Sequence, residues 1–474
     1  MIPAAWRAGE VAVVGLGKSG VAASLLLARE HMRVYASDAG TGARLDAAGG
    51  ALRARGVAVD LGAHDVERIA RASIVVASPG VPPDAPPLAR ARRSGVPIVS
   101  ELEIGLRMLR DTRVIAITGT NGKTTTTALI GHLLRILGHD AVDAGNIGVP
   151  VSEIALREHP PEWLALEVSS FQLHDTPGID PDVGVLTNLS PDHLDRYASV
   201  EDYYADKALL FRNATAGSKW VVNYDDVRVM RMIARVPGEH RYFGTLPPHG
   251  ITAADMYFTT APAHGSPEAR LGSDASPAIF WHGERLLSRD ELQLLGDHNV
   301  MNAMAAALAV LVADAAHQTP ESRMRIAGGL RSFHALPHRL ETVGEFASVL
   351  WINDSKATNV SSARVAIEGM TKPTIVLLGG RHKGEPYTAL LEPLRRHAKA
   401  VIAYGEAAPT IVRDLAGVRG LEQMGSDFTA VVERARSLAA PGDAVLLSPA
   451  CSSYDMFTNY EQRGETFRRL AGER

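Results

Sequence analysis

The strongest constraint on the fold of this chain is a pattern of short apolar strand, loop and helix that restarts three times. The restarts begin at Val11–Val14, Val114–Ile117 and Val349–Ile352. Strands and helices that alternate in this way build parallel α/β sheets. The length of 474 residues also predicts about three domains. We therefore predict an α/β protein with domains at residues 1–109, 110–336 and 337–474.

Other β-branched runs and periodic apolar positions predict the remaining elements. Strands are expected at Ile74–Ala77, Trp163–Val168, Val183–Leu186, Lys219–Val222, Thr374–Leu378, Ala400–Tyr404 and Ala444–Leu447. Helices are expected at Ser19–Glu30, Thr124–Leu137 and Asn299–Ala315. Prolines at positions 82, 83, 86 and 87 predict a loop without regular structure. Residues 245–290, punctuated by Gly, Pro and Thr, predict a small β excursion or loops.

The composition excludes several classes of protein. Lys and Arg total 49 against 53 Asp and Glu, so a net charge of −4 offers no basic field to nucleic acid or an anionic membrane. A single cysteine, Cys451, excludes an internal disulfide and a Cys-rich metal site. Apolar stretches end before the roughly 18 residues of a membrane span, and the N-terminus lacks the order of a signal peptide. We expect a cytoplasmic protein with no nucleic-acid partner and no membrane insertion.

The segment between the second strand and its helix has the composition of a phosphate-binding loop. Glycines let backbone N–H groups close around phosphate oxygens, and the helix N-terminus adds its positive dipole end. A lysine in such a loop reaches the terminal phosphates, and the hydroxyl after it ligates Mg²⁺. The two glycines here enclose two residues, whereas the usual loop has four between them. The segment consists of Gly119, Thr120, Asn121, Gly122, Lys123, Thr124 and Thr125.

A weaker glycine pattern follows the first strand. Gly15–Gly20 matches the dinucleotide fingerprint, and Asp38 lies near the distance expected for a ribose-binding acid. A nicotinamide or flavin cofactor is one interpretation. Glycines that only allow the helix and strand to pack closely are an equally good one.

Polar groups also follow two strands of the central domain. Glu167 lies at the end of one strand, and His193 comes after the next. Because the carboxyl ends of parallel strands line one edge of a sheet, we expect both to approach the phosphate loop, where they suit a divalent metal. Alternatively, Asp192 and Asp195 cap a helix and His193 is a surface residue.

Cationic side chains are the corresponding feature of the last domain. Arg339, Lys356 and Lys383 lie near strand ends, where they suit an anionic substrate or charge that develops on phosphate. Each one taken singly is by default exposed to solvent. The same default applies to Lys207, which lies on an expected helix.

Together these motifs resemble the Mur ligases, the ATP-dependent amide-bond ligases of peptidoglycan synthesis. The resemblance runs from Gly15 to Gly464, and the shortened phosphate loop is typical of this superfamily. Within the family, the motifs at 353–359 and 448–464 resemble those of the members that add D-glutamate. Sister ligases have a tyrosine-containing motif in place of the first.

The resemblance implies a fold and a reaction. The expected fold has a Rossmann-like N-terminal UDP-binding domain, a central P-loop ATPase-type domain with a parallel sheet, and a C-terminal Rossmann-like domain. The expected enzyme adds D-glutamate to UDP-N-acetylmuramoyl-L-alanine through an acyl phosphate, with ATP and two Mg²⁺ ions. It is expected to be a monomer.

The resemblance also implies residue roles, by match to the family's motifs. Catalytic and metal-binding roles are expected for Lys123, Thr124, Glu167, His193 and Lys207, the last of which is carbamylated in the family. ATP is expected to contact the phosphate loop with Asn299, Asn302, Arg339, Asp354 and Lys356. The UDP-sugar is expected at Lys18, Ser19, Ser78, Asn146 and His193. D-glutamate is expected at Thr358, Lys383, Ser453 and Tyr460, where the tyrosine replaces a more familiar phenylalanine.

Rival functions stay open on the sequence alone. A sister Mur ligase or a folate-type polyglutamate ligase would use another acceptor. A nicotinamide-dependent oxidoreductase would use the Gly15–Gly20 loop but would leave Lys123 unexplained. A phosphate-loop NTPase that works as a switch or motor would hydrolyse nucleotide without an amino-acid acceptor.

Overall fold

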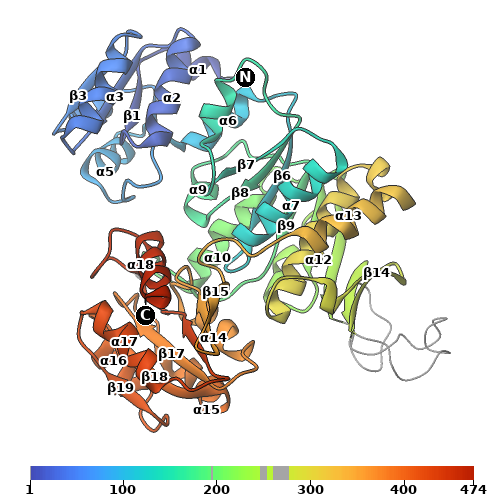
Figure 1. Cartoon of the computed structure of the whole chain (residues 1–474). Coiled ribbons are helices and arrows are strands. Elements are labelled where there is room, and N and C mark those ends of the chain that lie inside the picture. The colour runs from blue at the N-terminus through green and yellow to red at the C-terminus, as the bar shows by residue number, and fades with distance from the viewer. Residues whose placement is uncertain (1, 194–195, 246–253, 260–276, 474) are drawn as a thin grey trace.

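The computed structural model describes residues 2–193, 196–245, 254–259 and 277–473, and it has three sheets in succession along the chain (Figure 1). Helices flank each sheet, which confirms the predicted three-domain α/β fold. The predicted domain limits stay predictions; each falls between the last strand of one sheet and the first strand of the next. Within the described residues, no helix is both long and apolar enough to cross a membrane.

The first sheet is wholly parallel, with strand order β3-β2-β1-β4-β5. Its strands are β1 (Val11–Val14), β2 (Val34–Asp38), β3 (Ala58–Leu61), β4 (Ile74–Ala77) and β5 (Ile98–Ser100). The helices are α1 (Ala4–Arg7), α2 (Lys18–Arg29), α3 (Ala43–Arg53), α4 (Val66–Ile69), α5 (Pro86–Arg93) and α6 (Glu101–Met108). Strands β1 and β4 are fully buried, as their unbroken apolar sequences predict.

The proline-rich segment corrects one expectation. Helix α5 begins at Pro86 and includes Pro87, so the predicted irregular loop is wrong for these two residues. A proline in the first turn of a helix loses no hydrogen bond, since the N–H groups there have no partner within the helix, and its fixed φ suits the helix.

The second sheet has the order β14-β13-β12-β11-β10-β9-β6-β8-β7, parallel from β7 to β12 and antiparallel beyond. Its strands are β6 (Arg113–Thr118), β7 (Ala141–Gly145), β8 (Trp163–Glu167), β9 (Val183–Leu186), β10 (Lys219–Asn223), β11 (Glu239–Thr245), β12 (Met256–Thr259), β13 (Ala278–Trp281) and β14 (Glu284–Ser288). The helices are α7 (Lys123–Leu137), α8 (Val151–Ala155), α9 (Ser170–His174), α10 (Val200–Ala208), α11 (Val227–Ile233), α12 (Asp297–Ala313) and α13 (Pro320–Ser332). The expected β excursion is present as β12 to β14, while 246–253 and 260–276 lie outside the described residues.

The third sheet has the order β15-β16-β20-β17-β18-β19, parallel except for the β15–β16 hairpin. Its strands are β15 (Glu341–Phe346), β16 (Val349–Asn353), β17 (Thr374–Gly379), β18 (Ala398–Tyr404), β19 (Leu421–Gln423) and β20 (Ala444–Leu447). The helices are α14 (Val360–Glu368), α15 (Leu391–His397), α16 (Ala408–Asp414), α17 (Phe428–Leu438) and α18 (Tyr460–Gly472).

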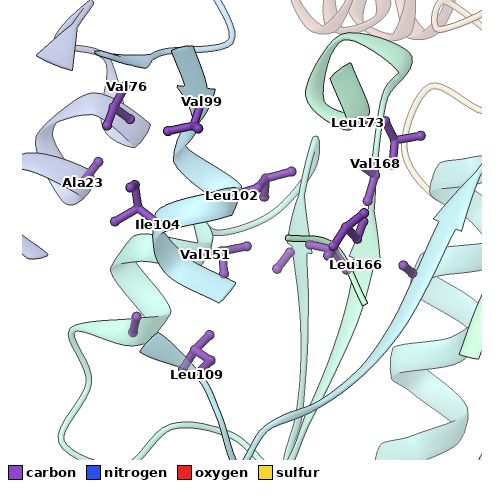
Figure 2. Packing of buried hydrophobic residues seen from close by; sticks show 14 of the residues in the cluster. Ala23, Val76, Val99, Leu102, Ile104, Leu109, Val151, Leu166, Val168 and Leu173 are labelled. Carbon is purple, nitrogen blue, oxygen red and sulfur yellow. The ribbon is translucent and has the colours of Figure 1, made fainter. Parts of the chain in front are cut away.

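Helix α6 joins the first two sheets by packing. Figure 2 shows Leu102 and Ile104 of this helix between side chains of the first sheet, such as Val99, and side chains of the central domain, such as Val151 and Leu166. These residues belong to one continuous apolar cluster. The first two domains therefore share part of their core.

Candidate active site

The phosphate loop connects β6 to α7 and has a backbone that only glycine permits at two positions. Gly119 has φ +144° and Gly122 has φ +83°, both in the region that L side chains avoid. A Cβ on Gly119 would collide with the hydroxyl of Thr187, and one on Gly122 with the side-chain oxygen of Asn302. The two glycines thus give the loop its tight course around the start of α7. The first N–H groups of a helix have no partner within the helix, so this end of α7 suits an anion.

Lys123 and Lys207 converge on this loop. Lys123 Nζ donates to the carbonyls of Gly119 (2.9 Å) and Thr120 (2.8 Å), and Lys207 Nζ donates to the same Gly119 carbonyl (2.7 Å). Lys207 is 1% exposed, so the solvent-exposed default for this helical lysine is wrong. The side chain extends from α10 to the phosphate loop, and its Nζ lies over the ring of Tyr203, 4.6 Å from the ring centre.

Burial lowers the pKa of both lysines. Desolvation lowers the pKa of Lys123, although Glu167 and Asp192 oppose the effect. Desolvation, together with the charge of Lys123, lowers the pKa of Lys207 well below its usual value. Lys207 therefore loses its proton more readily than an exposed lysine does, and the neutral amine is the form that reacts with carbon dioxide.

Glu167 closes β8 and faces this group of cations. Its Oε1 accepts a hydrogen bond from Asn146 Nδ2 at 2.8 Å, and its buried Oε2 has no hydrogen-bond partner within the described residues. Burial acts to raise the pKa of Glu167, but the charges of Lys123 and Lys356 together with hydrogen bonding to the carboxylate hold this pKa below the ordinary value. The side chain is consequently a buried carboxylate with a free oxygen.

His193 lies beyond β9 in a left-handed backbone conformation, with φ +56°. Its backbone N–H donates to Asp192 Oδ1 at 2.8 Å, and its ring packs edge-on against Phe171. Burial lowers the pKa of the ring to about 4, so it is neutral at neutral pH and has a lone pair for a metal. The alternative that Asp195 caps a helix lies outside the described residues.

Within the described residues, no group of three or more His, Cys, Asp or Glu side chains forms a ready-made metal site. The expected set of Thr124, Glu167, His193 and Lys207 differs from such a group, because it includes a hydroxyl and needs a modified lysine. The unpartnered Oε2 of Glu167 and the neutral ring of His193 fit a divalent cation.

A cavity of about 320 Å³ opens beside the phosphate loop, between the central and C-terminal domains. Asn299 and Asn302 line it from α12, and Arg339, Asp354 and Lys356 line it from the C-terminal side. Burial raises the pKa of Asp354 to about 7, and burial together with Arg339 lowers that of Lys356 to about 8. The structure thus brings together the side chains expected to bind ATP.

The same cavity has walls that the motifs did not indicate. The additional lining residues include Phe243, Leu294, His298, Leu336, Ser361 and Ser362. The apolar lining residues could not be predicted from the sequence, because an apolar residue that faces a cavity has the same sequence pattern as one in the core. His298 adjoins Asn299 in the same short segment, which is the only hint.

A second cavity of about 680 Å³ lies in the N-terminal domain and includes Lys18, Ser19 and Ser78. Asp38 also lines it, but its carboxylate accepts from the backbone N–H groups of Leu16 (2.7 Å) and Gly40 (2.8 Å). Asn146 and His193 are not part of this cavity. The residues expected to bind the UDP-sugar therefore fall into two groups, one in the N-terminal domain and one beside the phosphate loop.

The residues expected to bind D-glutamate lie in the C-terminal domain. Lys383 Nζ donates to Thr358 Oγ1 at 3.3 Å. Ser453 is buried and comes shortly before the start of α18 in the sequence. Tyr460 opens α18, with the ammonium of Lys356 5.1 Å from the centre of its ring. Lys356 thus links this region to the nucleotide-side cavity that it also lines.

The C-terminal domain contacts the phosphate loop directly. Arg339 Nη2 donates to Thr124 Oγ1 at 2.7 Å, and Asn121 Nδ2 donates to Ser361 Oγ at 3.1 Å. A phosphate loop, an adjoining cavity and a covering domain rich in cations define a nucleotide-dependent α/β enzyme.

Comparison with known proteins places this enzyme in a family. Three family models match the chain: the Mur ligase MurD-like N-terminal domain at residues 9–100, the Mur ligase middle domain at 117–310, and the Mur ligase, glutamate ligase domain at 338–451. The chain belongs to the Mur ligase family of ATP-dependent carbon–nitrogen ligases, as its motifs predicted.

Curated relatives are similar over nearly their whole length. The UDP-N-acetylmuramoylalanine--D-glutamate ligase of Anaeromyxobacter dehalogenans is 41% identical over 98% of this chain and 97% of its own. The protein of that name from Salinibacter ruber is 38% identical over 99% of both chains.

Solved structures show the same fold at low identity. The MurF ligase of Thermotoga maritima in complex with ADP matches with a TM-score of 0.62 at 17% identity, covering 99% of each chain. The UDP-N-acetylmuramate-alanine ligase MurC of the same organism matches with a TM-score of 0.58 at 18% identity, covering 98% of this chain and 100% of its own.

Proposed function

We propose that this chain joins D-glutamate to the L-alanine carboxylate of UDP-N-acetylmuramoyl-L-alanine, with release of ADP and phosphate, in peptidoglycan precursor synthesis. The observation that carries the proposal is the phosphate loop with Lys123 and Glu167, covered by a C-terminal domain that holds Lys356 and Lys383. The shared name of the curated relatives supports D-glutamate as the amino acid. We further propose a monomer that works in the cytoplasm, where both nucleotide substrates are available.

In the first step, the substrate carboxylate attacks the γ-phosphate of ATP and gives an acyl phosphate and ADP. The N-terminus of α7 and the Lys123 ammonium stabilise negative charge on the transferring group. Lys123 is held at the loop by two carbonyls, and it exchanges them for phosphate oxygens when nucleotide binds. Arg339 approaches the same loop from the C-terminal domain, at Thr124.

Two Mg²⁺ ions are part of the proposal, and the donor set present suits them. Thr124, Glu167, His193 and carbamylated Lys207 would hold them. When bound, the ions would supply positive charge that neutralises the phosphoryl group during its transfer. Carbamylation forms a bond between Lys207 Nζ and the carbon of carbon dioxide with loss of a proton, and it leaves one N–H that can still donate to the Gly119 carbonyl.

In the second step, the amine of D-glutamate attacks the acyl phosphate, and phosphate leaves from a tetrahedral intermediate. We assign the carboxylates of D-glutamate to Lys383, Thr358, Ser453 and Tyr460. Lys383 supplies the charge, and the hydroxyl groups supply hydrogen bonds that fix the amino acid. Lys18, Ser19 and Ser78 are assigned to the UDP end of the other substrate, and Asn146 and His193 to its reacting end.

The test is a set of incubations with UDP-N-acetylmuramoyl-L-alanine, ATP and Mg²⁺, each with one amino acid, followed by mass analysis and measurement of ADP. The panel contains D-glutamate, L-glutamate, L-alanine and diaminopimelate, and one further incubation has no amino acid. We expect product and ADP with D-glutamate only. A product with another amino acid would instead identify a sister ligase, and ADP release without any acceptor would indicate a simple NTPase.

A further inference from the structure

The first turn of α14 bridges the C-terminal and central domains by side-chain hydrogen bonds. Ser362 Oγ donates to Asn121 Oδ1 at 2.7 Å, and Asn121 Nδ2 donates to Ser361 Oγ at 3.1 Å. Asn121 belongs to the phosphate loop, so this turn contacts the loop itself. Asn359, the residue that caps this turn, makes a further hydrogen bond to Asp192 of the central domain.

The amide of Asn359 is used at both ends. Its Oδ1 accepts from the backbone N–H of Ser362 at 2.7 Å and caps α14. Its Nδ2 donates to Asp192 Oδ2 of the central domain at 2.9 Å. Asn359 is 7% exposed and Asp192 is 9% exposed, so water competes little for this bond. A side chain that only capped the helix would not need an amide.

Asp192 passes this contact on to His193. Its second oxygen, Oδ1, accepts the backbone N–H of His193, which lies in the left-handed conformation. One carboxylate therefore joins Asn359 to the backbone of His193 with one oxygen for each. On the other side, Asn359 follows Thr358 directly, and Thr358 Oγ1 accepts from Lys383.

We propose that Asn359 is a positioning residue, which acts through Asp192 to set the backbone of His193 relative to the Thr358–Lys383 side of the site when the C-terminal domain is docked. The inference rests on the proposed function, and it adds a contact between the part of the site on the central domain and the part on the C-terminal domain. Because these two parts belong to different domains, the hydrogen bond from Asn359 to Asp192 fixes the position of one relative to the other.

The sharpest test exchanges the amide and the carboxylate. In N359D the helix cap is kept, because aspartate caps as well as asparagine, but two buried carboxylates then face each other. In the double variant N359D/D192N the amide at position 192 can donate to the carboxylate at 359 and still accept from the His193 N–H. The pair is thus reversed with both hydrogen bonds and the total charge kept.

We expect kcat/KM for D-glutamate to fall about 100-fold in N359D, since a small misplacement of reacting groups has an effect of this order. The double variant should recover at least about tenfold relative to N359D, as expected for two residues in direct contact. N359S is the matched control for the cap: it keeps a capping hydroxyl, lacks the donor to Asp192, and should lose activity without being rescued by D192N.

Folding is followed separately by thermal unfolding and by calorimetric binding of UDP, which is assigned to the N-terminal cavity with Lys18, Ser19 and Ser78. UDP binding should change less than about twofold, because that cavity lies in another domain and shares no partner with Asn359. Activity of N359D within threefold of the parent chain would overturn the inference, and so would a double variant no more active than N359D. Failure of the parent chain to form ADP with D-glutamate would instead overturn the proposed function.

Discussion

The Gly119 carbonyl accepts hydrogen bonds from two buried lysines, Lys123 and Lys207. A buried ammonium that has only neutral acceptors is poorly compensated, so a phosphate group is a favourable replacement partner. Lys123 is therefore held close to the place where the phosphates are expected, and a small movement of its side chain would bring the ammonium to them.

We expect Lys123→Ala to reduce ADP formation by at least about 10²–10³-fold, the usual effect of removing a group that stabilises transition-state charge. The measurement is ADP release with both co-substrates present. Lys219→Ala is the control, because Lys219 begins β10 and donates to the Val312 carbonyl instead of the loop. Full turnover by the Lys123 variant would remove this lysine from the mechanism.

Lys207→Ala should be nearly inactive, and short carboxylates such as acetate or formate should restore part of the activity. The expected reason is that a small acid occupies the volume and the charge of the missing carbamate. Activity is measured against the concentration of added carboxylate, with chloride at equal ionic strength as the control. Wild-type activity without any addition would show that Lys207 has no role at the metal.

At the scale of elements, α6 carries a titratable group into the interface with α8. Glu101 is 2% exposed, and its carboxylate accepts from the backbone N–H of Ser152. Burial raises the pKa of Glu101 from 4.5 to about 7. The folded chain consequently binds this proton more tightly than the unfolded chain does.

The sign of the pH dependence follows from that difference. Between pH 7 and 4.5 the contribution of Glu101 to the free energy of unfolding should rise as pH falls, because its proton is bound in the folded state and not in the unfolded state. Glu101→Gln should therefore be more stable than the parent chain at pH 8, by about 1–3 kcal/mol, with a difference that shrinks toward pH 4.5. Denaturant unfolding at pH 5 and pH 8 measures it; an equal difference at both would contradict the buried ionisation.

Much of the architecture could be predicted from the sequence, because strands buried on both faces read as short apolar runs. Val11–Val14, Ile74–Ala77 and Val183–Leu186 have the predicted bounds. Helix α5 could not be predicted from proline count, since the effect of proline depends on its position within a helix.

The site was predictable where a motif fixes the chemistry and not where packing does. The loop around Lys123 has a recognisable spacing, and its neighbours on the strand ends follow from parallel topology. The burial of Lys207 depends on how α10 meets the phosphate loop, which is a contact between segments far apart in sequence. The bond from Asn359 to Asp192 is of the same kind, since it crosses two domains.

At the scale of the whole molecule, Arg339 connects two domains at the phosphate loop. It belongs to the C-terminal side but donates to Thr124 at the start of α7. We expect Arg339→Ala to raise the KM for ATP by about 10–100-fold, the range for loss of a charge-assisted hydrogen bond, and to change the KM for D-glutamate much less. Steady-state kinetics with each substrate varied in turn gives both values.

Arg364→Ala is a suitable comparison for that experiment. Arg364 lies on the exposed side of α14 and pairs with Glu368 four residues on, so its loss should leave both KM values near those of the parent chain. An equal rise in the two KM values of the Arg339 variant would mean that it disturbs the domain as a whole.

The N-terminal cavity and the phosphate loop belong to different sheets, with α6 between them. A molecule held by its uridine end in that cavity can present a carboxylate to Glu167 and Lys123 only if its other end extends far enough. If the uridine end of the substrate binds in that cavity, as proposed, the separation of the two sites limits which substrates react. A truncated nucleotide sugar would then bind in the first cavity and leave ATP uncleaved. Such fragments should compete with the full substrate without being consumed.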